Sequence, residues 1–283
     1  DHIDVFSADF PKRFAEFSAA AVELIKTETG RRPTVTPVNE ISFLSWGGGD
    51  HALFNPMTKG RGDELKRQLV SASIAAIEAV WSVDREIRIT HTDPAINVVP
   101  FPGKPRTNRL ARERSEAQFQ AWDMISGRLH PELGGKPEYL DIIGVNYYCH
   151  NQWLVDGPPL EWEVSQEGYT PPRHLFARIH QRYGRPMYIS ETGIEAELRP
   201  KWFDYICTEV HEAMAAGVPI HGICLYPVMN HPGWVDDRHC PNGLIDYDPK
   251  TMRRWPDEPL LAELRRQQER FAPLLQEEQT AAA

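Results

Sequence analysis

The feature that most constrains the fold is a regular alternation of short apolar runs with longer amphipathic segments. The short runs are apolar almost throughout, which is typical of strands buried on both faces of a parallel sheet. The longer segments carry apolar residues at helical spacing. This alternation predicts an α/β fold, either a barrel or a doubly wound sheet. The expected strands are 33–38, 86–90, 139–148, 186–190 and 220–228, and the expected helices are 9–30, 62–81, 114–129, 172–183, 199–217 and 258–278.

Polar side chains lie at or just after the end of each expected strand. In a (β/α)8 barrel the functional residues gather at the carboxyl ends of the strands, which favours a barrel. A doubly wound sheet also places its ligands at that edge, so this alternative stays open. The residues concerned are Asn39, Glu40, His91, Asp93, Asn146, Tyr148, Ser190, Glu191 and Tyr226.

Charge and composition exclude several classes of partner. The 283 residues include 31 basic and 40 acidic side chains, for a net charge of −9. This balance disfavours nucleic acid and anionic membrane surfaces, since both attract positive charge. No apolar run approaches the roughly 20 residues of a membrane span, and the first residues lack the pattern of a secretory signal.

Cysteine usage indicates a reducing compartment. The four cysteines form no C-x-x-C pair, so we expect free thiols, a cytoplasmic location, no metal site and no cofactor.

Two of the strand-end residues are the carboxylates Glu40 and Glu191, which lie 151 residues apart in the sequence. Strands of one barrel would bring them together across its mouth. Hydrolysis of a glycoside with retention needs such a pair about 5–5.5 Å apart, one group as acid and the other as nucleophile. The alternative is structural, since a glutamate after a strand can also cap a helix or pair with an arginine.

Five short motifs resemble, in the same order along the chain, the motifs of family 1 β-glycosidases, a family of retaining enzymes with (β/α)8 barrels. They are "VNE" at 38–40, "DIIGVNYY" at 141–148, "YISETG" at 188–193, "YPVMNHPGW" at 226–234 and "NGLIDYD" at 242–248. The first resembles the acid/base motif after strand four of the family, and the third resembles the nucleophile motif of strand seven.

The resemblance implies a retaining hydrolase of β-linked O-glycosides that works by double displacement. Glu191 would be the nucleophile, and Glu40 would be the general acid and then the base. A transglycosylase or a non-catalytic carbohydrate-binding relic of the same fold is the alternative. The implied substrate-binding residues are Asn39, Asn146, Tyr148, Tyr226 and Trp234.

The chain also departs from the family pattern. Ile41 replaces the proline after the acid, and Tyr226 replaces the tryptophan of strand eight. Gly233 replaces the glutamate that holds the outer sugar hydroxyls in the family, so we do not expect ordinary glucosidase or galactosidase specificity. Arg238 and His239 are candidate contacts to an acidic or phosphorylated sugar, or else they only solvate their loop.

The resemblance begins just before the fourth strand of the family barrel, at residues 4–19. We therefore expect residues 1–283 to form a single catalytic domain, a (β/α)8 barrel in partial form with strands four to eight and their helices. A barrel open at two edges would be poorly stable and weakly active.

Two further segments invite weaker predictions. The sequence "WGGGD" at 46–50 is expected to be a flexible loop over the cleft, with Trp46 either at an outer subsite or as a packing anchor. His91 and Asp93 are too few to hold a metal, and we expect them to support the acid through hydrogen bonds.

Overall fold

The sheet at the centre of the molecule is parallel, and its strands lie side by side in the order in which they occur along the chain. The structure is a computed structural model and describes residues 4–164, 166–233 and 236–281. Its strands are β1 (Thr90–Pro94), β3 (Ile142–Asn146), β5 (Met187–Thr192) and β6 (Ile220–Leu225), in the order β1-β3-β5-β6. Each strand thus pairs with the next parallel strand along the chain, as in the wall of a barrel. A doubly wound sheet would instead reverse its strand order at a switch point.

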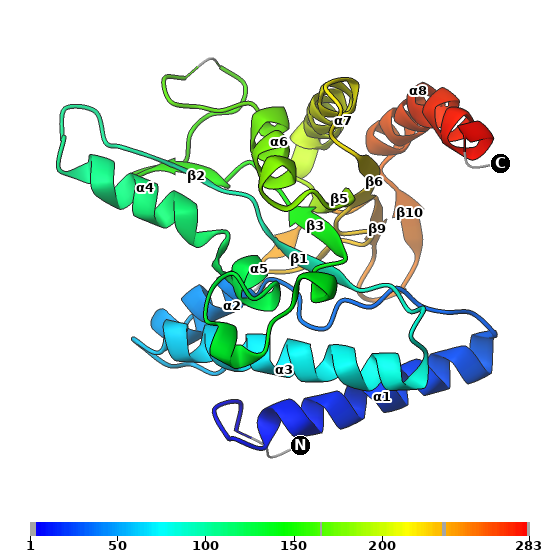
Figure 1. The fold of residues 1–283 in the computed structure, drawn as a ribbon. Coiled ribbons are helices and arrows are strands. Elements are labelled where there is room, and N and C mark those ends of the chain that lie inside the picture. The colour runs from blue at the N-terminus through cyan, green and yellow to red at the C-terminus, as the bar shows by residue number, and fades with distance from the viewer. Residues whose placement is uncertain (1–3, 165, 234–235, 282–283) are drawn as a thin grey trace.

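Helices connect the strands and surround the sheet. In Figure 1 they follow one another around it, from α1 (Phe10–Thr29) and α3 (Gly62–Val83) below to α6 (Pro172–Tyr183), α7 (Arg199–Ala215) and α8 (Glu258–Ala281) above. The α1 helix packs on α3, and α7 packs between α6 and α8. As predicted, α1 ends at Gly30, whose φ of 65° is the left-handed conformation that glycine adopts readily.

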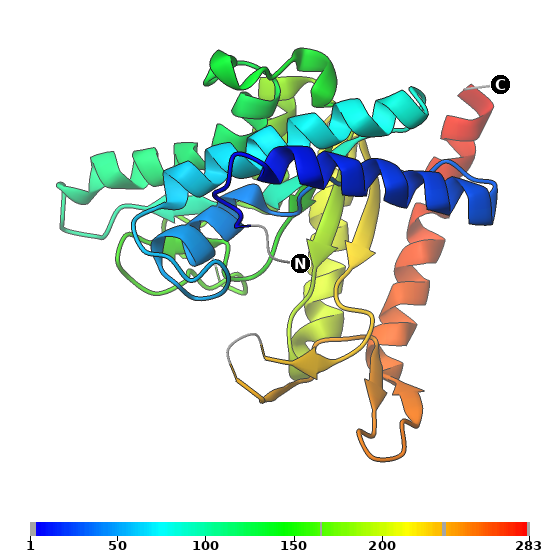
Figure 2. The same cartoon turned by 90° about the horizontal axis from the view of Figure 1, so that it is seen from below.

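Shorter elements lie in the loops, most of them at the carboxyl ends of the strands. Figure 2 shows the two hairpins β7–β8 and β9–β10 beyond the ends of β5 and β6. These shorter elements are α2 (Ile41–Leu44), a π-helix (Ser45–Asp50), β2 (Asn97–Val99), α4 (Thr107–Ala117), α5 (Gln120–Ile125), three 3-10 turns (Pro131–Leu133, Pro137–Tyr139 and Ala196–Leu198), β4 (Gln152–Leu154), β7 (His231–Pro232), β8 (His239–Cys240), β9 (Ile245–Tyr247) and β10 (Arg254–Pro256).

The core lies between the sheet and its helices and contains large aromatic side chains. Trp202 of α7 is fully buried, and its indole N–H donates to the hydroxyl of Thr192 at the end of β5, at 2.9 Å. Trp122 of α5 is buried likewise and donates to the carbonyl of His91, at 3.2 Å. Both tryptophans therefore tie a strand end to the surrounding helices.

The prediction of a strand at 33–38 is wrong. Only Val35 pairs there: its N–H donates to the carbonyl of Arg88, and its carbonyl accepts from the N–H of Thr90. Pro33 and Pro37 have no N–H to donate, so a longer ladder cannot form at these positions. The segment lies along the outer side of β1 as a single bridge.

Two other boundaries also differ from the predictions. The strand expected at 86–90 begins only at Thr90 and continues to Pro94. The helix expected at 114–129 is broken into α4 and α5 beside Gln118. The side chain of Gln118 donates to the carbonyls of Ser115 and Ile96 and accepts from the N–H of Ile96. These bonds replace helical ones and tie the break to the loop after β1.

Candidate active site

Glu40 stands where the extended segment ends and the short helix α2 begins. Its N–H donates to the carbonyl of Thr92 at 2.9 Å, and its φ of 53° and ψ of 55° are left-handed, which is uncommon for a residue with a side chain. The side chain makes no helix-capping hydrogen bond. Instead, Oε1 accepts from Nδ2 of Asn146 at 2.8 Å. The capping explanation for this glutamate therefore does not hold.

Glu191 lies near the end of β5, and each of its two carboxylate oxygens accepts a hydrogen bond. Tyr148 Oη donates to Oε2 at 2.8 Å, and Asn39 Nδ2 donates to Oε1 at 3.0 Å. The hydrogen bond expected between Tyr148 and Glu191 is thus present. A shift in the register between β3 and β5 sets Glu191 directly opposite Asn146. Such irregularities re-aim side chains near functional sites.

Two amides connect the carboxylates, and hydroxyl groups fix how these amides point. Thr92 Oγ1 donates to Oδ1 of Asn39 at 2.5 Å, and Ser190 Oγ donates to Oδ1 of Asn146 at 2.5 Å. Because each Oδ1 receives a hydroxyl, each Nδ2 faces a carboxylate. Thr92 was not among the residues predicted from the sequence. A small hydroxyl residue one position before Asp93 at a strand end was the available signal.

The environments of the two carboxylates differ. Partial burial, together with the negative charges of Glu191 and Asp93, raises the pKa of Glu40 to about 7, against the hydrogen bond from Asn146, which lowers it. Glu40 therefore keeps a proton up to near neutral pH. Glu191 faces two donors, Asn39 and Tyr148, which stabilise a negative charge. Within the described chain, neither glutamate forms an ion pair with a lysine or an arginine.

Tyr226 follows β6 and lies close to the same cluster. Burial and the charges of Glu191 and Glu40 together raise the pKa of its hydroxyl. The ring is 38% exposed and faces His231, with 6.2 Å between the ring centroids. A side chain at Gly193 would place Cβ 2.0 Å from the carbonyl oxygen of Tyr226, so glycine is needed there. Trp234 lies outside the described residues.

The prediction that both His91 and Asp93 hydrogen-bond the acid is wrong. His91 is buried and its Nε2 lies 3.0 Å from the carbonyl oxygen of Tyr139, away from Glu40. Asp93 accepts from the N–H and hydroxyl of Ser42 and reaches Glu40 only through its charge. The reason is alternation: residues two apart in a strand share a side, so His91 and Asp93 point away from the side on which Thr92 reaches Asn39.

The glycine-rich segment at 46–50 is not the flexible loop that the sequence predicts. Residues 45–50 form a π-helix in which Gly47, Gly48 and Gly49 are buried. A Cβ on Gly47 would lie 2.4 Å from the ring of Phe54, so the segment is closely packed and is not an open loop. Trp46 is 49% exposed, with its ring centroid 4.9 Å from that of His51.

Arg238 and His239 are each paired with a carboxylate of a neighbouring segment. Arg238 donates twice to Glu195, at 2.7 and 2.8 Å, and His239 Nε2 lies 3.3 Å from Asp246. These pairs favour the interpretation that the two residues stabilise their own loop.

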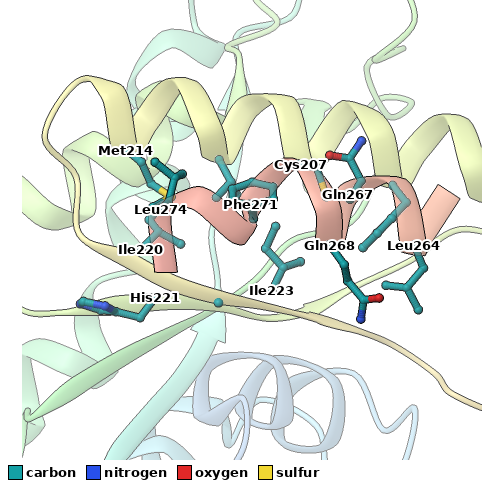
Figure 3. Close-up of a pocket in the computed structure, with 13 residues that line it drawn as sticks. Cys207, Met214, Ile220, His221, Ile223, Leu264, Gln267, Gln268, Phe271 and Leu274 are labelled. Atoms are coloured by element: carbon teal, nitrogen blue, oxygen red, sulfur yellow. The ribbon is translucent and has the colours of Figure 1, made fainter. Parts of the chain in front are cut away.

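A separate pocket of about 320 Å³ lies between α7, β6 and α8 (Figure 3). Its lining is mainly apolar and includes Ile223, Leu264 and Phe271. None of the predicted site residues lines it, so we place the candidate active site at the strand ends.

Three general expectations concern metals, membranes and cysteines. No group of three or more His, Cys, Asp or Glu side chains among the described residues is arranged to hold a metal ion. None of the helices in the described ranges combines the length and apolar character of a membrane span. The four cysteines are free thiols.

Comparison with known proteins shows the fold to which this arrangement corresponds. No family model matches the chain. It is similar to the family 1 β-glucosidase from Thermotoga maritima, with a TM-score of 0.75 and 16% identity, covering 94% of this chain and 69% of that one. It is also similar to the β-glycosidase from Thermosphaera aggregans, with a TM-score of 0.74 and 18% identity, covering 92% and 60%.

Two curated proteins are similar in sequence. A thermostable β-glucosidase B from Thermobispora bispora is 27% identical over 150 residues, covering 43% of this chain and 32% of that protein. A β-galactosidase from Sulfolobus acidocaldarius is 23% identical over 282 residues, covering 85% and 55%. The chain therefore spans between about a third and just over half of these relatives. The resemblance to family 1 β-glycosidases and the partial (β/α)8 fold are confirmed.

Proposed function

We propose that this chain carries the two catalytic carboxylates of a retaining hydrolase of β-linked O-glycosides. The observation that carries the proposal is the contrast between Glu40, whose pKa is raised to about 7, and Glu191, which accepts two hydrogen bonds. Acid catalysis paired with nucleophilic attack requires one carboxyl group that keeps its proton beside a second carboxyl group that hydrogen-bond donors hold in place.

In the first step, Glu40 gives its proton to the glycosidic oxygen while Glu191 attacks the anomeric carbon. The bond to the leaving alcohol breaks and a glycosyl ester forms on Glu191. In the second step, ionised Glu40 takes a proton from water, whose oxygen attacks the anomeric carbon. The ester bond then breaks, and both carboxyl groups return to their starting states.

The neighbouring side chains have distinct proposed roles. Tyr148 holds one oxygen of Glu191 so that the other oxygen faces the sugar. Asn39 donates to Glu191 in the absence of sugar and would turn this amide to the 2-hydroxyl of a bound substrate. Tyr226 and Trp234 would supply apolar platforms for the sugar face, and Asn146 would support Glu40.

A fluorinated substrate tests the proposal. A 2-deoxy-2-fluoro β-glycoside with a good leaving group slows the second step more than the first, so the glycosyl ester accumulates. We expect mass spectrometry of the protein, expressed with any segment encoded upstream, to place the added sugar on Glu191. Glu191→Gln should take up no label.

Glu195→Gln is the matched control, because Glu195 lies four residues further along and pairs with Arg238 instead of the site. It should be labelled as the unmodified protein is. Label on another residue, or none with retained turnover in Glu191→Gln, would refute the mechanism. Transfer of the sugar to an added alcohol in preference to water would indicate a transglycosylase. Sugar binding without any label or turnover would indicate a carbohydrate-binding relic.

A further inference from the structure

Asp93 is a buried carboxyl group beside Glu40 that the proposed reaction does not use. It lies in β1 and is 1% exposed. Its Oδ1 accepts from the backbone N–H of Ser42 at 3.1 Å, and its Oδ2 accepts from the hydroxyl of Ser42 at 2.9 Å. Ser42 is the second residue of α2, the helix that begins directly after Glu40. Asp93 therefore holds the first turn that follows the acid.

The hydrogen bonds between Ser42 and Asp93 lie next to a residue with an unfavourable backbone conformation. Glu40 has a left-handed backbone, which is unfavourable for a residue with a Cβ and persists only when its surroundings fix it. On one side, the N–H of Glu40 donates to the carbonyl of Thr92. On the other side, both bonds from Ser42 end on Asp93. The same strand thus fixes the chain before and after Glu40.

The charges around the pair come from several elements. Lys66 of α3 faces Asp93 with its positive charge, but its ammonium group donates to Gln120 at 2.7 Å. Within the described chain, no ion pair neutralises Asp93. Burial raises its pKa to about 7, against the opposing effects of Ser42 and Lys66. The other titratable or charged groups facing Glu40, Asp93 or Lys66 are Asp50, Asp63, Tyr148, Glu191 and Tyr226.

We infer that Asp93 is a positioning residue for Glu40, because its two hydrogen bonds with Ser42 fix the turn that aims the carboxyl group. When Asp93 is ionised, its negative charge also opposes ionisation of Glu40. The inference rests on the proposed role of Glu40 as general acid, but its physical content is independent of turnover. Asp93 is buried, with its carboxyl group bound to Ser42, so it acts through Ser42 and Glu40.

Replacement by asparagine separates the two effects. In Asp93→Asn, the amide oxygen still accepts from the N–H of Ser42, and the amide nitrogen donates to the hydroxyl, so the turn is kept while the charge is lost. In Asp93→Ala, both bonds and the charge are lost. Glu209→Gln is the matched control, because Glu209 is another buried carboxyl group, on α7, and is bound to Arg173.

The experiment follows the side-chain carboxyl carbon of Glu40 by NMR as a function of pH in residues 1–283. We expect the titration midpoint in Asp93→Asn to move to lower pH by less than about 1 pH unit, because the like charge of Asp93 is the smallest of the effects that act on the pKa of Glu40. It should stay unchanged in Glu209→Gln. Ser42→Ala should give a smaller shift in the same direction, because it weakens the hydrogen bonding that favours ionised Asp93.

Turnover gives an independent second readout. The alkaline limb of the pH–rate profile should move with the midpoint in Asp93→Asn, whereas Asp93→Ala should lower kcat at every pH. An unchanged Glu40 midpoint in a folded Asp93→Asn protein would overturn the inference. If that variant does not fold, an unchanged midpoint in Ser42→Ala would do the same. A shifted midpoint without any glycoside turnover would leave the inference standing and count against the proposed function.

Discussion

The carboxyl ends of the strands and the edges of the sheet differ in how far their polar groups are paired. At the strand ends, hydrogen bonds of 2.8 to 3.5 Å link Asn39, Asn146, Tyr148 and Glu191. At the β6 edge, His221, Gly222 and Cys224 are exposed, and beyond them lies the apolar pocket of Figure 3. The opposite edge, beyond β1, carries one β-bridge, at Val35.

This difference indicates that the candidate site and the pairing of the sheet edges depend on different residues. The carboxyl ends of β1, β3 and β5, with the segment before α2, bring the two carboxylates into one hydrogen-bonded cluster. The two edges of the sheet, in contrast, present unpaired backbone groups, and further strands would be needed to pair them. The chain is similar to part of a barrel. This agrees with a sheet that holds the candidate site at its strand ends but has two open edges.

The largest expected effect is at the strand ends and concerns activity. Glu191→Gln should lower kcat for an aryl β-glycoside by roughly 10⁴-fold or more, because loss of a nucleophile removes the covalent route. The free energy of unfolding should change by less than about 1 kcal/mol, since the amide has the same shape. Steady-state rates and urea unfolding measure the two effects. A large loss of stability would mean that this carboxylate also supports the fold.

The second prediction concerns the pH dependence of stability. The pKa of Glu40 is raised from 4.5 to about 7 on folding, so the folded state binds this proton more tightly. Its stabilising contribution is fully present below pH 4.5 and is lost as the pH rises through 7. We expect the unmodified chain to lose on the order of 2 kcal/mol more than Glu40→Gln over this range. Urea unfolding between pH 4 and 8 measures the difference. Parallel curves for the two proteins would contradict the raised pKa.

The third prediction tests whether the hydrogen bonds of the strand ends matter individually. Tyr148→Phe removes the donor to Glu191 Oε2, and a hydrogen bond to a charged group contributes about 1.5–3 kcal/mol. We therefore expect kcat to fall roughly 10- to 100-fold. In the control Tyr169→Phe, a hydroxyl bound to Tyr205 at 3.0 Å is removed away from the carboxylates. An equal loss in both variants would show that the effect of Tyr148 is structural.

The sequence predicts those parts of the molecule that depend on local pattern. The strand of "PMYIS" and the helices beginning at Pro172 and Arg199 have strong periodicity, and they form as expected. The meeting of Glu40 with Glu191 was predicted from the order of the motifs, because parallel strands of one barrel end at the same rim.

The parts that could not be predicted depend on partners distant in sequence. The segment at 33–38 has the composition of a strand, but its pairing is limited to Val35 by the neighbouring prolines and by the absence of a described strand on its other side. The π-helix at 45–50 forms because Phe54 and Gly62 pack against its glycines. The anchor from Asp93 to Ser42 spans 51 residues, and no local pattern indicates it.

The smallest expected effect lies on α1 and tests the open side of the molecule. Phe17 and Leu24 of this helix are 68% and 61% exposed, whereas Val22 between them is 3% exposed. In residues 1–283, Leu24→Lys should change the free energy of unfolding by no more than about 0.5 kcal/mol, as an exposed substitution does. Val22→Ala should cost about 2 kcal/mol, because it leaves a cavity against α3. The same two variants are then measured in the protein expressed with any segment encoded upstream. If Leu24→Lys lowers the free energy of unfolding by more than Val22→Ala only in that longer form, the added segment covers this face of α1. A small cost of Leu24→Lys in both forms would mean that this face of α1 is exposed to solvent in both.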